Sequence, residues 1–420
     1  MAEGNARDTQ RRAHDQGGQS QDRPAAGSNR GSSPQVKSPG WSAARTATID
    51  IMEEPSPRVT FAQRPILVFW ETTVACPLSC RHCRASAVHH PLPGQLDLAE
   101  SLDLVEQVAE LGHPRPVLVM TGGDCLARPD LRELVAHART LGVPVALSPS
   151  VSPKLDRPTM AEMKSLGVKA VSVSLDGSTP DTHDRVRGVD GHFEATVEAI
   201  RWLVEMGFRV QVNTTVMRSN LEELADVAAL LLRLGVPIWE VFFLIEVGRG
   251  EDLRSPTAEE NEEVCHFLYE TSRHPLLVRT VEAPFFRRVV AERRAGGSFS
   301  GPLYERLRSR LQELAGPGGR PPRPQTVGTR DGMGVVFVSH DGLVRPSGFL
   351  PLAVGDLRRQ RLAEVYRESP LLRSIRAAEF SGRCGSCSYR QLCGGSRARA
   401  FADGGDPLGE DPGCAYRPAA

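Results

Sequence analysis

ETTVACPLSCRHCRASA (71–87) places three cysteines in one short loop, directly after the apolar run ILVFWET (66–72). The three cysteines are Cys76, Cys80 and Cys83. Three thiolates in such a loop can ligate three irons of a four-iron cluster, and the fourth iron then stays open to a chelating ligand. Taken alone, the loop leaves open a zinc site that combines these thiolates with His82, His89 or His90.

Short apolar runs alternate with amphipathic segments up to about residue 245, which is typical of parallel strands joined by helices. The expected strands are 66–72, 117–121, 143–148, 170–176, 209–216 and 240–245. The expected helices between them are 98–109, 130–141, 159–166, 193–206 and 221–234. Repeats of a strand and a helix can curl into a partial (β/α)6 barrel, whose active site lies at the carboxyl ends of the strands. We therefore predict an α/β fold whose functional motifs follow the strands.

Composition divides the chain into four parts. Residues 1–58 are rich in polar residues, Gly and Pro, and we predict a disordered tail there. The barrel core is expected over 59–250, and a helical extension with a Gly- and Pro-rich linker over 251–333. Residues 334–420 should form a small C-terminal domain that opens with a β-hairpin around an Asp-Gly pair.

The second expected strand ends in Thr121-Gly122-Gly123-Asp124, a turn in which the glycines would let a ligand approach the backbone. Together with the cysteine loop, this turn resembles the radical S-adenosylmethionine (SAM) superfamily, whose members commonly have Glu where Asp124 stands. The resemblance implies a TIM-like radical SAM barrel and a [4Fe-4S] cluster that binds SAM and cleaves it reductively.

The resemblance extends to polar residues that follow later strands. Ser174 in a Ser-Leu-Asp-Gly turn, Arg187 and Asn213 match positions that contact SAM in the superfamily. By the resemblance, Ser174 supplies a hydroxyl contact, and Arg187 pairs with the carboxylate of SAM through its forked guanidinium. The implied SAM contacts are Gly122, Gly123, Asp124, Ser174, Arg187 and Asn213. Without the cysteine loop, Ser-Leu-Asp-Gly would equally be an ordinary turn after a strand.

A second cysteine set lies near the C-terminus. Its members are Cys384, Cys387, Cys393 and Cys414. Four thiolates satisfy a metal site completely, so this set predicts a structural or electron-transferring site, with a zinc knuckle as the alternative. The segment resembles the auxiliary-cluster region of the SPASM and twitch groups of radical SAM enzymes. Arg397 stands where a further cysteine would follow, so the resemblance implies one auxiliary [4Fe-4S] cluster. The remaining cysteines, Cys125 and Cys265, are predicted to be packing residues.

The composition of the chain argues against nucleic acid and membranes as binding partners. Lys and Arg total 51, as do Asp and Glu, so no net charge favours nucleic acid or a membrane surface. No apolar run is long enough to span a bilayer, and nine cysteines without a secretory signal favour metal chemistry in a reducing compartment. We therefore expect a cytoplasmic protein, and the resemblance implies a reducing electron donor of the flavodoxin or ferredoxin type.

The reaction is inferred from the resemblance alone. CRHCRASA and the C-terminal segment from Cys393 to Cys414 are most similar to the branch that contains the alternative heme synthases and the enzymes of nitrite-reductase heme synthesis. That branch implies hydrogen abstraction from a propionate of an iron tetrapyrrole, with oxidative decarboxylation. The alternatives are a SPASM-type maturase of a ribosomally made peptide and, more remotely, a non-catalytic zinc scaffold. General acid and base residues are not identifiable from the sequence.

Overall fold

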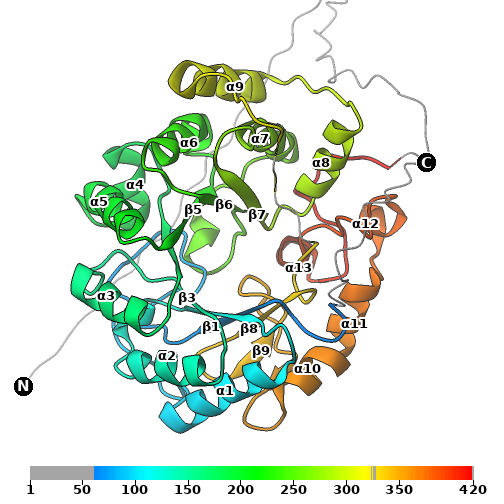
Figure 1. Ribbon diagram of the computed structural model, residues 1–420. Coiled ribbons are helices and arrows are strands. Elements are labelled where there is room, and N and C mark those ends of the chain that lie inside the picture. The colour runs from blue at the N-terminus through cyan, green and yellow to red at the C-terminus, as the bar shows by residue number, and fades with distance from the viewer. Residues whose placement is uncertain (1–60, 323, 325–327, 419–420) are drawn as a thin grey trace, which may run out of the picture. The chain divides into compact units, whose positions relative to one another are not determined.

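The computed structural model describes residues 61–322, 324 and 328–418. The predicted disordered tail at 1–58 lies outside these residues. The described part is built on one sheet of ten strands, in the order β10-β9-β8-β1-β2-β3-β4-β5-β6-β7. Helices lie on the outside of this sheet, and α13 lies near the gap between β7 and β8 (Figure 1).

Parallel pairing follows the sequence from β1 to β7. The strands of this run are β1 (Leu67–Glu71), β2 (Val117–Thr121), β3 (Val145–Leu147), β4 (Ala170–Ser174), β5 (Arg209–Val216), β6 (Ile238–Phe243) and β7 (Leu277–Val281). All six strands expected from the sequence are present. The seventh, β7, was missed, because its few residues lie between two segments with strong helical patterns.

The chain then returns to the other edge of the sheet. The last strands are β8 (Val335–Val338), β9 (Leu343–Arg345) and β10 (Gly355–Asp356). β8 pairs in parallel with β1, and β9 folds back on β8 as the predicted hairpin. The sheet therefore continues across the domain boundary predicted at residue 334, and among the described residues β7 and β8 do not pair. The barrel stays open along this seam, as the predicted partial barrel requires.

Helices α1 to α9 lie between successive strands and cover the outer face of the sheet, and α10 to α13 follow the last strand. They are α1 (Leu98–Glu110), α2 (Leu131–Thr140), α3 (Arg157–Ser165), α4 (Pro180–Arg187), α5 (His192–Glu205), α6 (Leu224–Arg233), α7 (Ala258–Thr271), α8 (Phe286–Arg294), α9 (Pro302–Ala315), α10 (Leu362–Glu368), α11 (Pro370–Ala377), α12 (Gly382–Ser386) and α13 (Arg397–Gly404). Short 3-10 turns are η1 (Cys125–Ala127), η2 (Leu221–Glu223) and η3 (Gly248–Asp252). Within the predicted helical extension, α8 and α9 are two helices separated by a Gly-rich break.

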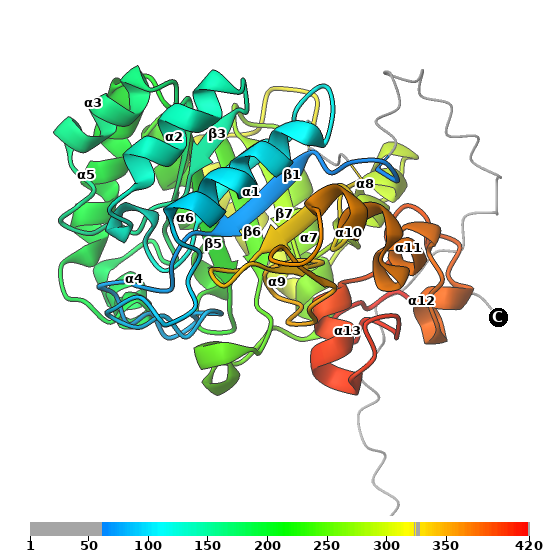
Figure 2. The same cartoon turned by 90° about the horizontal axis from the view of Figure 1, so that it is seen from below.

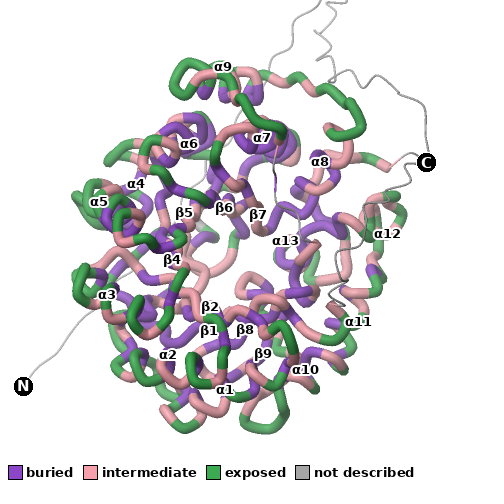
Figure 3. Tube along the Cα trace, in the orientation of Figure 1, coloured by how far each residue is buried: buried purple, intermediate pink, exposed green. Residues whose placement is uncertain are grey.

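Alternate residues along each strand have different environments. On β5, Val210 and Val212 are fully buried against the helices, whereas Gln211 and Asn213 line an internal cavity. Figure 3 shows the same contrast for the whole described chain, with buried strands inside and exposed outer turns on the helices. The alternation arises because successive side chains of a strand point to opposite faces. The sheet therefore presents an apolar outer face to the helices and a partly polar inner face to the cavity.

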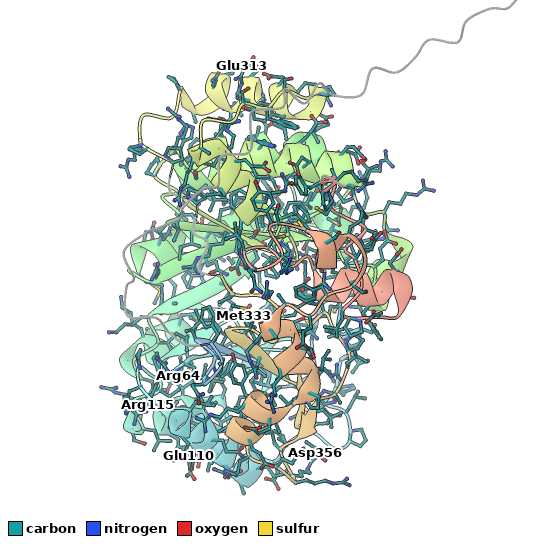
Figure 4. The ribbon with its side chains drawn as sticks, turned by 90° about the vertical axis from the view of Figure 1, so that its right-hand side faces the viewer. Arg64, Glu110, Arg115, Glu313, Met333 and Asp356 are labelled. Carbon is teal, nitrogen blue, oxygen red and sulfur yellow. The ribbon has the colours of Figure 1, made fainter. Side chains whose placement is uncertain are left out.

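The C-terminal elements α10 to α13 gather on one side of the molecule (Figure 2). Ion pairs attach them to α1: Arg361 contacts Asp103 at 2.9 Å and Glu110 at 2.8 Å. In Figure 4, Glu110 of α1 and Asp356 of β10 lie at the same end of this side of the molecule. No helix in the described residues is both long enough and apolar enough to cross a membrane.

Candidate active site

An internal cavity of about 590 Å³ runs through the barrel, and the first cysteine loop forms part of its wall. Its lining includes Cys76, Cys80, Cys83, Gly122, Gly123, Ser174, Arg187 and Asn213. These residues follow β1 or β2, end β4, lie in α4 or belong to β5, so the barrel brings together segments that are far apart in sequence. Most of the predicted cofactor-binding residues therefore share one cavity with the cysteine loop.

Residues from other strand ends hold the loop in place. Arg249 of η3 donates hydrogen bonds from Nε to the Cys80 carbonyl at 2.9 Å and from Nη1 to the Ala87 carbonyl at 2.8 Å. The Ser150 hydroxyl, after β3, lies 3.3 Å from Cys76 Sγ. Neither Ser150 nor Arg249 is among the contacts predicted from the sequence. Position directly after a strand was the only signal that could have identified Ser150.

Gly122 and Gly123 pack directly against the chain that enters the first cysteine loop. A Cβ atom on Gly122 would lie 2.3 Å from the Thr73 carbonyl oxygen, and one on Gly123 would lie 2.4 Å from that of Ala75. Instead, the Gly123 amide donates to the Thr73 carbonyl at 2.7 Å, and the Asp124 amide to Ala75 at 2.8 Å. The sequence suggested that the glycines let a ligand approach the backbone. The structure adds a steric reason, because a side chain at either position would clash with the carbonyl oxygen of Thr73 or Ala75. Only glycine lets β2 end against the chain that enters the cysteine loop.

Asp124 is the predicted SAM contact that the structure does not bring to the cavity. Its carboxylate is fully buried and accepts hydrogen bonds from the Leu126 and Ser150 amides and from the Ser152 hydroxyl. Burial raises its pKa, and the hydrogen bond from Ser152 opposes that rise. The side chain therefore fixes the loops after β2 and β3, and Gly122 and Gly123 are the members of this turn that reach the cavity.

Ser174 of β4 and Asn213 of β5 lie directly opposite each other in the parallel pairing of these two strands. Both line the cavity, and the Asn213 side-chain oxygen accepts a hydrogen bond from Gln211 Nε2 at 2.8 Å. The structure therefore brings these two predicted residues side by side. Their polar groups are available to a ligand at the carboxyl ends of the strands, which is where barrel enzymes bind their substrates.

Arg187 lies beside the cluster loop and is almost fully buried. Its Nη2 is 2.5 Å from the Asp176 carboxylate, and its Nη1 donates to Cys80 Sγ at 3.6 Å. Although burial alone would raise the pKa of Asp176, the charge of Arg187 holds that pKa well below its ordinary value. Both terminal nitrogens of the fork are therefore engaged within the protein.

The histidines proposed for a zinc site do not join the thiols. His82 Nε2 faces Asp176 at 3.1 Å, and His89 and His90 are exposed. Within the residues that the structure describes, no three His, Cys, Asp or Glu side chains converge as ligands of a single metal ion. The thiols of Cys76, Cys80 and Cys83 instead pack around Leu78 and Ala87 at the cavity wall.

The chemistry of the loop fits a cluster that carries an anionic ligand. Buried polar atoms without a hydrogen-bond partner surround it: Arg249 Nη2, Arg187 Nε and His82 Nδ1. A buried donor without a partner costs free energy, so such atoms commonly face a ligand. Three thiolates, two arginines and the polar strand ends can therefore hold an iron–sulfur cluster and a ligand with a carboxylate.

All four cysteines of the second set line one small cavity of about 30 Å³. Cys393 Sγ accepts a hydrogen bond from the Gly395 amide at 3.5 Å, and Cys387 Sγ accepts one from Tyr389 at 3.4 Å. Burial raises the pKa of Cys393 to about 11 and that of Cys414 to about 12. Metal ligation would displace these protons, because the thiolate is the ligand. The four thiols thus share one cavity and two of them accept backbone hydrogen bonds, although no three of them converge on a single point as ligands of one metal ion.

Arg397, which stands where a further cysteine was considered, is fully buried. It donates to the carbonyls of Pro407 at 3.1 Å and Gly409 at 2.7 Å, and its Nη2 lies 3.7 Å from Cys384 Sγ. The guanidinium therefore folds the last loop back on the cysteine site, and it brings a positive charge to the thiol.

Gly395 lines both the large cavity and the small one. Ser396 lines the large cavity, and Gly394 lines the small one, so the backbone at this point is the wall between the two sites. The remaining cysteines, Cys125 and Cys265, are fully buried in the hydrophobic core, as packing residues should be.

Comparison with known proteins gives the same picture. The model of the Radical SAM superfamily matches residues 70–231. The AdoMet-dependent heme synthase of Oleidesulfovibrio alaskensis is 36% identical over 84% of this chain and 87% of its own. The mycofactocin maturase MftC of Mycobacterium ulcerans is 30% identical over 83% of this chain and 88% of its own.

Among solved structures, Streptococcus suis SuiB bound to S-adenosylmethionine has a similar fold. Its TM-score is 0.61 at 15% identity, over 84% of this chain and 78% of that one. Membership implies a [4Fe-4S] cluster with SAM and an iron–sulfur enzyme that catalyses radical chemistry. This chain belongs to the radical SAM superfamily, in the branch that holds AdoMet-dependent heme synthases and SPASM-type maturases.

Proposed function

We propose that the enzyme abstracts a hydrogen atom from a propionate side chain of an iron tetrapyrrole and thereby starts an oxidative decarboxylation. The observation that carries this proposal is the common cavity. One space has the first cysteine loop in its wall, shares Gly395 as a lining residue with the cavity of the second cysteine set, and is lined by several arginines. A substrate with several carboxylates suits such a lining.

The residues of the first site have separate roles in this proposal. Cys76, Cys80 and Cys83 hold the cluster. When bound, the cluster and SAM supply the 5′-deoxyadenosyl radical that takes the hydrogen atom. Gly122, Gly123, Ser174 and Asn213 contact SAM from the strand ends, and Asp124 positions their loops. A donor of the flavodoxin or ferredoxin type supplies the reducing electron.

Arg187 and Arg249 are both candidates for the carboxylate of SAM. The two terminal nitrogens of Arg187 already donate to Asp176 and Cys80, which leaves its Nε. Arg249 Nη2 has no partner among the described residues and lies in the wall of the same cavity. We therefore add Arg249 to the predicted contact set, as a donor that the sequence did not identify.

The electron balance assigns a role to the second site. Loss of a hydrogen atom and of carbon dioxide converts a propionate into a vinyl group only if one further electron leaves the substrate. We propose that Cys384, Cys387, Cys393 and Cys414 hold an auxiliary [4Fe-4S] cluster that takes this electron. The thin wall at Gly395 supports that assignment, because electron transfer favours short separations.

A ribosomally made peptide is the competing substrate. The 30% identity to a mycofactocin maturase favours it, whereas the 36% identity to a heme synthase over a similar share of the chain favours the tetrapyrrole. Both substrates need the same radical, so only product analysis separates them. The tetrapyrrole is preferred because the heme synthase relatives are more similar to this chain.

The test is anaerobic reconstitution with iron and sulfide, followed by incubation with SAM, dithionite and iron coproporphyrin III. We expect about eight irons per chain for two four-iron clusters, formation of 5′-deoxyadenosine, and conversion of propionate to vinyl groups by mass spectrometry. Deoxyadenosine without a changed porphyrin, together with modification of a precursor peptide, would move the assignment to the maturases. Bound zinc without SAM cleavage would overturn it entirely.

A further inference from the structure

Three chain segments that are remote in sequence meet where the barrel is open between β7 and β8. Glu282 follows β7, Asp331 precedes β8, and Ser396 is the residue before α13. All three are buried and line the large cavity. Ser396 donates a hydrogen bond to Glu282 through its hydroxyl, and the Ala398 amide donates to Asp331 at 3.1 Å. The C-terminal elements thus close the seam with polar contacts.

Glu282 and Asp331 form a carboxyl pair at this seam. Their side chains share a hydrogen bond, which requires a proton on one of them. Burial and the neighbouring Asp331 raise the pKa of Glu282 well above its ordinary value, which favours a proton on Glu282 within the pair. Glu282 also has a φ of 58°, which is rare for a residue other than glycine and is frequent at functional sites.

Two arginines face the same seam without an ion-pair partner. Among the described residues, Arg287 has no carboxylate within salt-bridge distance, and its printed hydrogen bond goes from Nη1 to the Leu392 carbonyl at 3.2 Å. Burial lowers its pKa, because the attraction of Cys393 and Asp331 does not compensate for desolvation. The next residue, Arg288, is paired with Glu262. Arg287 therefore differs from its neighbour in lacking a buried counter-ion.

Arg330 complements Arg287 from the other side of the seam. It is almost fully buried, and its terminal nitrogens donate only to backbone carbonyls, among them Cys393 at 3.2 Å and Ile375 at 3.2 Å. Its Nε has no hydrogen-bond partner among the described residues. Burial lowers the pKa of Arg330 to about 10, which reflects a cation without a direct counter-ion. The seam thus has two cations and a carboxyl pair that shares a proton.

We propose that a carboxylate of the substrate binds at this seam against the guanidinium of Arg287, with Arg330 Nε and the hydrogen-bonded pair of Glu282 and Asp331 beside it. A substrate carboxylate would supply the counter-ion that Arg287 lacks, and a bidentate pair with arginine would fix its orientation. The seam lines the same cavity as the cysteine loop, so an anchor here holds a large substrate within that cavity. This assignment rests on the proposed function, because it takes the ligand to be a tetrapyrrole carboxylate.

The test compares Arg287→Gln with wild type and with Arg294→Gln, a control at an exposed position of the same helix. Reconstituted proteins are titrated anaerobically with iron coproporphyrin III and, in the same detergent, with its methyl ester. The change in the porphyrin absorption band gives each dissociation constant. We expect Arg287→Gln to weaken binding of the acid by about tenfold or more and to leave binding of the ester nearly unchanged. Arg294→Gln should match wild type with both ligands.

The outcomes separate this inference from the proposed function. If wild type binds the acid and Arg287→Gln binds it equally well, the anchor is refuted while the tetrapyrrole assignment stands. An equal loss of affinity for the acid and for the ester would also refute the anchor. Arg287 would then support the shape of the cavity and would not recognise the charge of the ligand. A wild type that does not bind iron coproporphyrin refutes both. If Arg287→Gln loses its iron, Arg287→Lys keeps the charge and should bind the acid with intermediate affinity.

Discussion

The two cysteine sites share one local feature, a buried arginine beside a thiol, but they differ in the number of cysteines and in the size of the adjoining cavity. At each site a buried arginine approaches a thiol: Arg187 lies 3.6 Å from Cys80 Sγ, and Arg397 lies 3.7 Å from Cys384 Sγ. The first site has three cysteines at the wall of a cavity of about 590 Å³, and the second has four around one of about 30 Å³. The number of thiols sets whether a coordination position stays open, and the cavity sets whether a substrate can reach it.

The largest expected effect is the loss of SAM cleavage when a cysteine of the first loop (Cys76, Cys80 and Cys83) is replaced. Cys80→Ala should remove a cluster ligand that no other described residue replaces, and SAM cleavage should fall to background. Deoxyadenosine formation and iron content measure the result, with Cys125→Ala as the control cysteine from the core. About half of the wild-type iron should remain, because the second site is unaffected. Full cleavage by the reconstituted Cys80→Ala protein would refute the assignment of the first site.

A mutation in the second cysteine set should impair product formation more than SAM cleavage. Cys387→Ala removes one of four ligands, and we expect part of the SAM cleavage to remain while formation of the decarboxylated product is strongly impaired. Comparing deoxyadenosine with product in one reaction measures this separation. If both fell equally while the first cluster stayed intact by its electron paramagnetic resonance signal, the proposed division of roles between the sites would be wrong.

A smaller effect is expected on folding when the buried arginine at the open site is removed. Arg187→Met leaves Asp176 without its closest cation, and the loss of a buried partner typically costs about 3–5 kcal/mol of unfolding free energy. Chemical denaturation of the protein without clusters measures the change. Arg185→Gln, exposed on the same helix, should lie within about 0.5 kcal/mol of wild type. Equal stabilities for both variants would mean that the ion pair at Asp176 contributes little.

The smallest expected effect is on the redox potential of the closed site. Arg397→Gln removes a positive charge and a donor to Cys384, and both favour the more negative reduced state of a cluster. The midpoint potential of the proposed auxiliary cluster should therefore fall in a titration followed by electron paramagnetic resonance. Arg373→Gln, on an exposed side chain, is the control. An unchanged potential would limit Arg397 to its contacts with the Pro407 and Gly409 carbonyls.

Much of the first site could be predicted because strand ends and cysteine spacing are local features. The structure brings Ser174 and Asn213 together as expected, and it leaves Asp124 out of the cavity, because three hydrogen bonds hold its carboxylate beneath the loops. Ser150 and Arg249 were not predicted, since a lone serine and a Gly-Arg-Gly turn have no distinctive spacing. Strand β7 was not predicted because it is short and lies between two helical segments.

The sequence by itself determined the two cysteine sets that are proposed as ligands, the six strands from β1 to β6 and the position of Arg397 where a further C-terminal cysteine was considered. These features depend on spacing along the chain, which needs no knowledge of distant contacts. Only the tertiary structure decided that the barrel stays open between β7 and β8 and that Gly395 separates the two cavities. It also decided that Glu282, Asp331 and Arg287 meet, because side chains from remote segments become neighbours only when the sheet curls and the C-terminal elements close its seam.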